Sequence, residues 1–253
     1  MSSNTHRFTG RAEDYDRYRQ RYPAAEILPH LHEWCGLTSQ RIVADIGAGT
    51  GMLSEVFLNN GNHVIAIEPN EEMRSVCAKL EVQWPALSVV NATAEATTLA
   101  DHSVDIIAAG RAFHWFNQEL AIPEFRRILK PESWVVLASL GRLQDADEQA
   151  LAFEQLLHHF GTDYKYVRSG YRVHEEMEEI FRGAFYQASI EGQQQLDWMS
   201  YLRQTLSLSM VPLPEDPRYA AFEEALRVHF ERFARGDELT IFSKCWITAG
   251  RLD

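Results

Sequence analysis

Three glycines alternate with other residues directly after an aspartate, and this spacing could hold a small charged ligand. Asp45 is the last residue but one of a short β-branched run, and Gly47, Gly49 and Gly51 follow that run before a helical pattern begins. Glycine lets the chain turn sharply and lets a ligand approach the main chain, because no Cβ fills the space. A glycine-rich turn that binds nothing is the alternative. The strand before the glycines and the helix after them favour a ligand site.

Two further residues narrow the identity of that ligand. The dinucleotide-binding pattern needs a small residue at position 52, so that helix and strand pack closely, and Met52 stands there. The carboxylate of Asp45 suits a cationic group and is a poor neighbour for a pyrophosphate. Glu68 ends the next β-branched run, where it can accept hydrogen bonds from the two hydroxyls of a ribose. A nucleoside with a positively charged tail therefore fits better than a dinucleotide.

A histidine with aromatic neighbours follows a later apolar run. His114, Trp115 and Phe116 come shortly after Val104–Ala109, at the strand end where open sheets bind ligands. With an ordinary pKa of about 6.5, His114 could take a proton from a nucleophile at neutral pH. Trp115 and Phe116 could exclude water or attract a cation. Alternatively, His114 caps the next helix and both rings belong to the core.

Tyrosines and arginines stand at helical spacing near the start of the chain. Tyr15, Tyr18, Arg19 and Tyr22 can share one face of a helix. Arg19 could then bind a carboxylate of a cofactor or of an acidic substrate with both ends of its guanidinium. A solvated amphipathic helix is the alternative. Arg203, in a later helical segment, is a second candidate for an anionic substrate beside the simpler reading of a solvated charge.

The elements that must position these residues are short apolar runs separated by helix-length segments. The first five runs are apolar on both faces, as a mostly parallel sheet covered by helices requires. The last two could pair as an antiparallel edge. The predicted strands are Arg41–Ile46, His63–Ile67, Leu87–Val90, Val104–Ala109, Trp134–Leu140, Phe185–Glu191 and Leu239–Thr248.

Helical patterns connect the strands and dominate after Gly141. Asn70 is a predicted N-cap, with acidic residues following it in the first turn. The segment Gln118–Lys130 should be a crossover helix, and we place its real start near Pro123, because proline inside a helix costs about 3 kcal/mol. The remaining predicted helices are Met52–Asn60, Asp145–Phe160, Leu196–Leu208 and Pro217–Phe233.

The composition limits the class of protein. The 253 residues include 24 Lys and Arg against 36 Asp and Glu, a formal net charge of −12 that argues against a nucleic-acid partner. Three cysteines lie far apart, which fits a reducing compartment, and no spacing typical of a metal site occurs. The longest apolar run, Trp134–Leu140, is far shorter than the roughly 20 residues that cross a bilayer. We expect a cytoplasmic protein without a membrane partner.

The chain resembles a known family over about residues 8–141. Val43–Gly51 followed by Ala66–Asn70 closely resembles the class I S-adenosylmethionine-dependent methyltransferases. Ala92–Glu95 is similar to the family's adenine segment, and Ser103–Ala109 to its fourth strand. The resemblance implies an α/β, Rossmann-like fold with seven strands, mostly parallel, helices on both faces and an antiparallel last strand. It also implies S-adenosyl-L-methionine as the cofactor.

Carried over residue by residue, the resemblance assigns a cofactor site. Thr93 departs from the pattern, since many relatives have an acid there, so Ala94 and Glu95 are the expected adenine partners. Where relatives carry Pro-Gly-Gly, this chain has Pro131, Glu132 and Ser133, and we expect only a different turn. The expected cofactor-binding residues are Asp45, Gly47, Ala48, Gly49, Glu68, Pro69, Met73, Ala94, Glu95, Gly110 and Arg111.

The N-terminal segment resembles the short helix that lies over the cofactor as a lid in the trans-aconitate and ubiquinone-type methyltransferases. That likeness adds Tyr15 and Arg19 to the cofactor side, and we expect Tyr22, Trp115 and Arg203 on the substrate side. It predicts one methyltransferase domain over residues 1–253. Its parts are lid helices (1–36), a cofactor-binding core (37–141), a mostly helical substrate-side insertion with one strand (142–238) and the final strand (239–253).

The predicted activity is methyl transfer to a small-molecule acceptor by in-line displacement. Most of the rate can come from holding the nucleophile about 3–3.5 Å from the methyl carbon. A carboxylate acceptor needs no base, whereas a hydroxyl or amine would make His114 the catalytic candidate. An anionic acceptor is among the options, and the protein is expected to be a monomer or homodimer. The alternatives are a protein that binds the cofactor without turnover and, less favoured, a nucleotide-dependent oxidoreductase.

Overall fold

A single seven-stranded sheet organises the molecule, with its strands in the order β3-β2-β1-β4-β5-β7-β6. The computed structural model describes residues 8–162, 164, 180–181 and 183–252. The strands are β1 Ile42–Ile46, β2 His63–Ile67, β3 Leu87–Val90, β4 Val104–Gly110, β5 Leu129–Arg142, β6 Phe185–Leu196 and β7 Leu239–Gly250. The first five are parallel, and β7 runs antiparallel to both of its neighbours, β5 and β6. The expected Rossmann-like sheet with an antiparallel last strand is confirmed.

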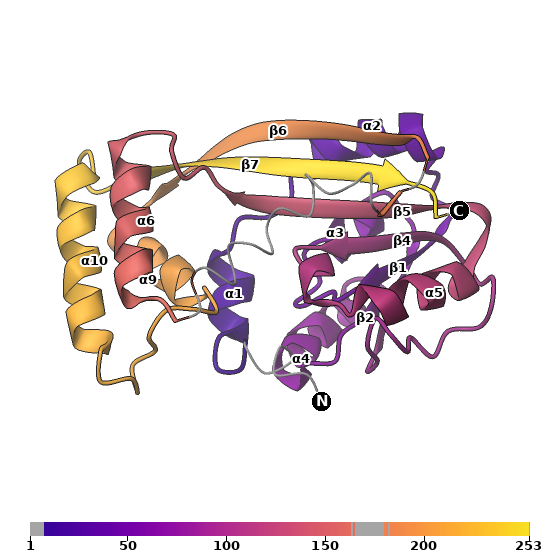
Figure 1. Ribbon diagram of the computed structural model, residues 1–253, viewed down its shortest axis with the longest axis horizontal. Coiled ribbons are helices and arrows are strands. Elements are labelled where there is room, and N and C mark those ends of the chain that lie inside the picture. The colour runs from indigo at the N-terminus through magenta and orange to yellow at the C-terminus, as the bar shows by residue number, and fades with distance from the viewer. Residues whose placement is uncertain (1–7, 163, 165–179, 182, 253) are drawn as a thin grey trace.

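Helices divide between the sheet and a separate block at one end of it (Figure 1). The block forms beyond the ends of the long strands β5, β6 and β7, and α1 lies between it and the rest of the sheet. The helices near the sheet are α1 Ala12–Tyr18, α2 Ala24–Cys35, α3 Ser54–Asn59, α4 Glu71–Lys79 and α5 Gln118–Ile128. Those of the block are α6 Glu148–Phe160, α9 Trp198–Leu206 and α10 Tyr219–Phe233.

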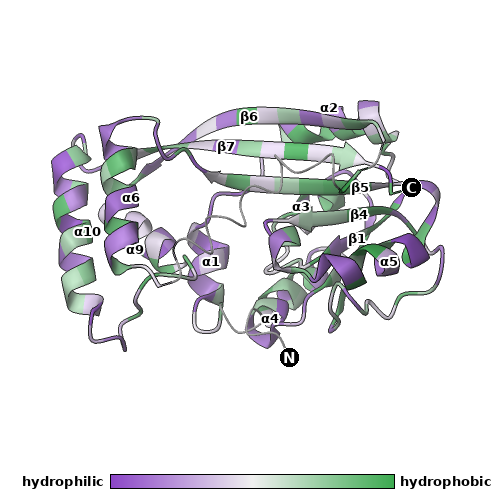
Figure 2. Ribbon diagram, viewed as in Figure 1, coloured by the Kyte–Doolittle hydropathy of each residue, from purple (hydrophilic) through white to green (hydrophobic). Residues whose placement is uncertain are grey.

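Apolar side chains form three buried clusters. Two cover opposite faces of the sheet, because alternate residues of each strand point to opposite sides: Val43 belongs to one cluster and Ala44 to the other. The strands β1, β4 and β5 are accordingly hydrophobic along most of their length (Figure 2). The third cluster fills the helical block, with Phe222 and Leu226 fully buried. The block therefore has a core of its own.

The structure corrects the predicted start of α5. The helix begins at Gln118, so Pro123 lies inside it. The first turn is held by hydrogen bonds from the N–H groups of Leu120 and Ala121 to the carbonyl of Asn117, at 3.0 and 2.8 Å. Ala121 and Phe125 on the same helix are fully buried, and that burial outweighs the helix bond that the proline removes. The low helix propensity of proline therefore predicted the wrong start for α5.

Two other expectations change in detail. The predicted helical face over residues 15–22 is wrong, because α1 ends at Tyr18 and Arg19 is already extended (φ −68°, ψ 142°). The turn expected at 131–133 instead lies inside β5, which begins at Leu129. Glu132 takes the left-handed φ of +58° there, a backbone conformation that favours glycine.

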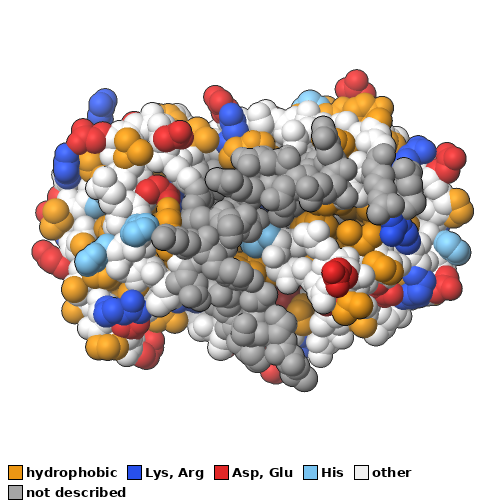
Figure 3. Space-filling view, in the orientation of Figure 1, with side chains coloured by type: hydrophobic (Ala, Val, Ile, Leu, Met, Phe, Trp, Pro, Cys, Tyr) orange, Lys and Arg blue, Asp and Glu red, His pale blue; other side chains and the backbone are white. Residues whose placement is uncertain are grey.

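In the face shown in Figure 3, the described acidic and basic side chains are interspersed without a large basic patch. Within the described ranges no helix has the length and apolar character needed to cross a membrane. All three cysteines, Cys35, Cys77 and Cys245, are buried and unpaired with each other.

Candidate functional site

The predicted ligand residues meet at the carboxyl edge of the sheet, where the strand order reverses. β1 lies between β2 and β4, so the loops that follow these three strands converge. Open α/β sheets bind ligands at such a reversal. The loop after β1 carries the glycines, Glu68 follows β2, and Arg111 follows β4. The topology thus brings together residues that are up to 66 positions apart in the chain, from 45 to 111.

The first two glycines of the loop have different roles. Gly47 has φ +68°, and a Cβ there would lie 2.7 Å from the Cβ of Ala112, so this glycine is needed for packing. Gly49 has φ +59°, and nothing lies within 4 Å of the place where its Cβ would be. Gly49 therefore leaves room beside the main chain, as a bound ligand would require.

The amides of this loop are already used by the protein. Gly47 and Ala48 both donate to the carbonyl of Ile67, at 2.8 and 3.0 Å, and Gly49 donates to Oε2 of Glu68 at 2.8 Å. A pyrophosphate would need such amides to point toward it. The geometry therefore disfavours the dinucleotide alternative for a second reason besides Met52.

Asp45 is fully buried and only half satisfied. Its Oδ2 accepts a hydrogen bond from the hydroxyl of Ser54 at 2.6 Å, while Oδ1 has no partner within the described ranges. Burial raises the pKa of this carboxyl to about 7, the negative charge of Glu68 adds to the rise, and the Ser54 hydrogen bond opposes it. A cationic ligand group would relieve this cost by pairing with the ionised carboxylate.

Two more buried polar atoms near the loop lack partners. Thr50 Oγ1 and the Tyr22 hydroxyl make no hydrogen bond to any part of the chain that the structure describes. Tyr22 packs against Gly110, where a Cβ would lie 2.8 Å from its hydroxyl. Unsatisfied buried groups are costly and call for an explanation. A polar ligand would supply the missing hydrogen bonds. We call Tyr22, Asp45, Thr50, Glu68 and Arg111 the carboxyl-edge site.

Glu68 is held in a fixed orientation by the main chain. Its Oε2 accepts from Gly49, and its Oε1 accepts from the N–H of Asn70 at 2.8 Å. Burial raises its pKa, and the two N–H donors counter part of that rise. A carboxylate offers about four lone-pair positions, so two hydroxyl donors can still be accepted.

Arginines and tyrosines from the N-terminal segment and from β4 form one cluster. The guanidinium of Arg111 lies 5.4 Å from the Tyr15 ring and 5.2 Å from the Tyr22 ring, and that of Arg19 lies 5.1 Å from Tyr15. Arg111 has the left-handed φ of +55°, a strained conformation for a residue with a side chain. Its Nη2 also contacts the sulfur of Met52 at 3.1 Å. Tyr22 thus joins the predicted group although it is not on α1.

The expected adenine side lies along α4 and the 92–97 turn. Met73 is buried, and its N–H donates to the side chain of Asn70 at 3.0 Å, which confirms the predicted N-cap. Ala94 is buried, whereas Glu95 accepts from the N–H of Asn117 at 2.9 Å. The Pro69 carbonyl accepts from Arg74 at 3.0 Å. Their contacts with adenine stay predictions.

The remaining substrate-side candidates lie in different environments. His114 lies in a single 3-10 turn, Phe113–Trp115, and burial lowers its pKa to about 4, so the imidazole is neutral at pH 7. Trp115 packs against the core of the helical block. Arg203 lies on the surface beside Asp14 at 3.4 Å, and it does not line the pocket described next.

Sequence reasoning missed a pocket between β5 and the helical block. Arg19 and Arg111 line it, and so does Arg142 at the end of β5. We call it the arginine pocket. Arg142 stands two residues past a predicted strand end, the same signal that identified Glu68. The other lining residues are Gln20, Leu140, Gly141, Phe153, Gln194, Tyr201, Gln204, Thr205, Leu208 and Ile241.

Known proteins share both sequence and fold with this chain. A family model described as a methyltransferase domain matches residues 44–137. An uncharacterized methyltransferase of Mycobacterium tuberculosis is 29% identical over 198 residues, which cover 78% of this chain and 72% of the relative. Another, from Schizosaccharomyces pombe, is 32% identical over 125 residues, covering 49% of this chain and 48% of the relative.

Solved structures agree in fold. A protein of Anaeromyxobacter dehalogenans, provisionally described as a type II methyltransferase, superposes with a TM-score of 0.60 at 22% identity, covering 92% of this chain and 98% of the other. The YcgJ protein of Bacillus subtilis gives a TM-score of 0.55 at 17% identity, covering 91% and 98%. Residues 44–137 of this chain are thus a methyltransferase domain, and the chain has the fold of solved methyltransferases. The family resemblance predicts S-adenosylmethionine as the cofactor, and the match to a methyltransferase domain supports that prediction.

The carboxyl-edge site of this methyltransferase fits that cofactor. The half-satisfied carboxylate of Asp45 suits its positive charge, and Glu68 retains acceptor positions for two hydroxyls. The open space beside Gly49 gives the ligand access to the loop. Among the side chains that the structure describes, no group of three or more His, Cys, Asp or Glu residues is arranged to hold a metal ion.

Proposed function

We propose that this methyltransferase transfers the methyl group of S-adenosylmethionine to a small-molecule acceptor that binds in the arginine pocket. One observation carries the proposal: Arg111 belongs to the carboxyl-edge site and also lines the arginine pocket. Its guanidinium touches Tyr15, Tyr22 and Met52 at the carboxyl-edge site, and the same residue lines the pocket.

The residues of the chain contribute mainly by position. Asp45, Glu68 and Met73 would hold the cofactor, which supplies a methyl group on a positively charged sulfur. Tyr15 and Tyr22 pack against Arg111 and would keep water from the cofactor. An acceptor held in the arginine pocket would approach the methyl group from the side opposite the sulfur. Orientation of this kind accounts for much of the rate of a displacement reaction.

The N-terminal segment acts as a lid in this proposal, because it is attached to the helical block as well as to the core. Arg11 donates to the carbonyls of Leu206 and Val211 at 2.5 and 2.7 Å, and Arg19 donates to Ser207 at 2.7 Å. On the other side, the N–H of Gly10 donates to Glu72 at 2.5 Å. The described part of the N-terminal segment, residues 8–36, would thus close over the cofactor core, with the helical block on the substrate side.

His114 is the proposed base when the acceptor is a hydroxyl or an amine. Burial keeps its imidazole neutral, so it can accept a proton, but the pKa of about 4 makes it a weak base. A carboxylate acceptor would need no base. The His114 role therefore applies only to acceptors that must lose a proton.

Calorimetry with S-adenosylhomocysteine tests the cofactor half of the proposal. Wild-type protein should bind it, and Glu68→Ala should weaken binding about 100-fold, since two hydrogen bonds to a charged group are lost. Glu124→Gln is the control, because that carboxylate lies on α5 and bonds to Thr97 and Arg127 instead. Equal affinity of wild type and Glu68→Ala would contradict the site.

Radiolabelled methyl transfer into a metabolite extract tests the acceptor half. Label in small molecules supports the proposal, and label confined to macromolecules contradicts it. Binding of S-adenosylhomocysteine without any transfer would favour a cofactor-binding protein without turnover. A fluorescence titration with NADH addresses the oxidoreductase alternative, for which we expect no binding.

A further inference from the structure

We propose that the arginine pocket binds a carboxylate group of the acceptor and that Arg142 is the residue that selects it. The inference rests on the function proposed above and names the chemical class of its substrate. It concerns recognition only, so it holds whether the methyl group goes to that carboxylate or to another atom of the same molecule.

The charge of the pocket is the first argument. Three arginines line it, and none of its described lining residues is acidic. The whole chain carries a formal net charge of −12, so this positive region runs against the balance of the molecule. Concentrated positive charge in a concave site attracts anions and raises their local concentration. An anionic group is therefore the favoured occupant.

The geometry of Arg142 is the second argument. Its Nη2 forms an ion pair with Oε1 of Glu154, and its guanidinium lies 4.3 Å from the centre of the Phe153 ring. These two contacts fix the plane of the guanidinium. Its Nε is buried and has no hydrogen-bond partner in the described parts of the chain. A guanidinium held in this way can form paired hydrogen bonds with a carboxylate, whose two oxygens match the fork.

The rest of the lining indicates an organic acid instead of an inorganic or polyphosphate anion. Leu140, Leu208 and Ile241 supply apolar wall, which suits a carbon skeleton. Gln204 supplies a fixed polar group, because its Nε2 donates to the carbonyl of Tyr18 at 2.7 Å and to Gln194 at 3.0 Å. Phosphate sites typically use loop amides or a helix N-terminus, whereas this lining is mainly side chains of strands and of α9.

Thermal shift and calorimetry on the full chain, saturated with S-adenosylhomocysteine, provide the test. The probes are butyrate, succinate and benzoate, their methyl esters, and inorganic phosphate. We expect the carboxylates to bind the wild type and the esters and phosphate not to bind. Arg142→Met should weaken carboxylate binding about tenfold or more, and Arg142→Lys should weaken it less.

Arg232→Met is the matched control. Arg232 also pairs with a glutamate of the helical block, Glu148, and its loss changes the net charge equally, but it does not line the pocket. Arg232→Met should bind the carboxylates like the wild type, and all variants should bind S-adenosylhomocysteine with the wild-type affinity. If Arg142→Met does not fold, Arg142→Lys provides the comparison.

The outcomes separate this inference from the function on which it rests. Equal carboxylate affinity of the wild type and the Arg142 variants overturns the role of Arg142. Failure of every carboxylate to bind, or preference for phosphate or the esters, overturns the carboxylate class while leaving cofactor binding intact. Absence of S-adenosylhomocysteine binding to the wild type overturns the proposed function itself.

Discussion

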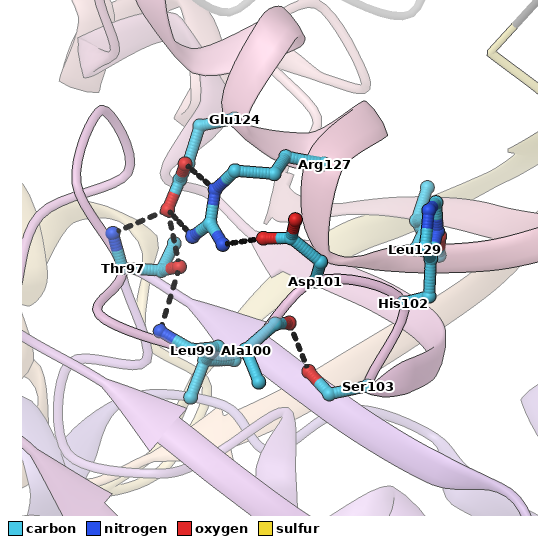
Figure 4. A network of polar contacts seen from close by, with 9 residues as sticks. All are labelled: Thr97, Leu99, Ala100, Asp101, His102, Ser103, Glu124, Arg127 and Leu129. Carbon is cyan, nitrogen blue, oxygen red and sulfur yellow. Dashed lines mark hydrogen bonds and ion pairs between the residues drawn. The ribbon is translucent and has the colours of Figure 1, made fainter.

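Two regions of this methyltransferase shift the pKa of a buried or partly buried carboxylate in opposite directions. In the polar network of Figure 4, Glu124 on α5 accepts hydrogen bonds from the N–H and hydroxyl of Thr97 and from Arg127, which also pairs with Asp101. These contacts hold the pKa of Glu124 at about 2, with the Arg127 hydrogen bond as the largest cause. At the carboxyl-edge site, burial instead raises the pKa of Asp45 to about 7.

The difference shows which region serves stability and which serves binding. In the polar network both carboxylate oxygens of Glu124 are matched within the protein, so the loop before β4 is fixed to α5. The carboxyl-edge site keeps Asp45 Oδ1, Thr50 Oγ1 and the Tyr22 hydroxyl without partners among the described residues. Proteins commonly give up stability at functional sites in this way. The contrast can be tested by exchanging charge for amide in each region.

The largest expected effect is on cofactor affinity. Asp45→Asn should weaken S-adenosylmethionine binding about 100-fold at pH 8, because a buried charge-assisted interaction of about 3 kcal/mol is lost. In the wild type, affinity should rise between pH 6 and pH 8, as the carboxyl with a pKa of about 7 ionises. Calorimetry at several pH values measures both. A flat wild-type profile would mean that Asp45 does not meet the charged group of the ligand.

The next effect concerns the stability of the protein without ligand. The folded pKa of Asp45 is raised from 3.8 to about 7, so the carboxyl favours folding below about pH 4 and that contribution is lost as the pH rises through 7. Asp45→Asn should therefore be more stable than the wild type at pH 8, by about 2 kcal/mol. Urea unfolding at pH 5 and pH 8 measures the difference. A destabilised variant at pH 8 would show that the ionised carboxylate is well accommodated.

Glu124→Gln should have the opposite effect in the polar network. The folded pKa of Glu124 is lowered from 4.5 to about 2, so its contribution is present above pH 4.5 and is lost as the pH falls toward 2. At pH 7 the variant should unfold about 2–4 °C below the wild type, the shift that about 1 kcal/mol gives in a protein of this size. Below pH 4.5 the two melting curves should converge, while S-adenosylhomocysteine affinity stays unchanged.

The smallest expected effect comes from Tyr22→Phe. Because the hydroxyl has no partner within the described residues, its removal should change the stability of the unliganded protein by less than about 0.5 kcal/mol. If a ligand bonds to the hydroxyl, its affinity for the variant should be lower than for the wild type, by a factor of less than about ten. Chemical denaturation and calorimetry on the same samples give both values. A large loss of stability would mean that the hydroxyl is satisfied after all.

Much of the fold could be predicted because its signals are local. β-branched runs such as Val104–Ala109 identify strands, and Asn70 followed by acidic residues identifies the start of α4. The start of α5 was misplaced since packing of Phe125 outweighed the preference of Pro123. The end of α1 was misplaced in the same way: Arg19 leaves the helix and bonds to Ser207, which is 188 residues away.

By itself, the sequence determined the strand pattern, the glycine loop with Asp45, and the acid at Glu68, because each depends on neighbours a few residues away. Only the tertiary structure decided that Arg19, Arg111 and Arg142 share one pocket and that Arg203 does not. Their meeting depends on the strand order, on the length of β5 and on the packing of α9 against α1, which no short stretch of residues specifies. Long-range packing decides which elements meet, and it produces no periodic pattern in the sequence.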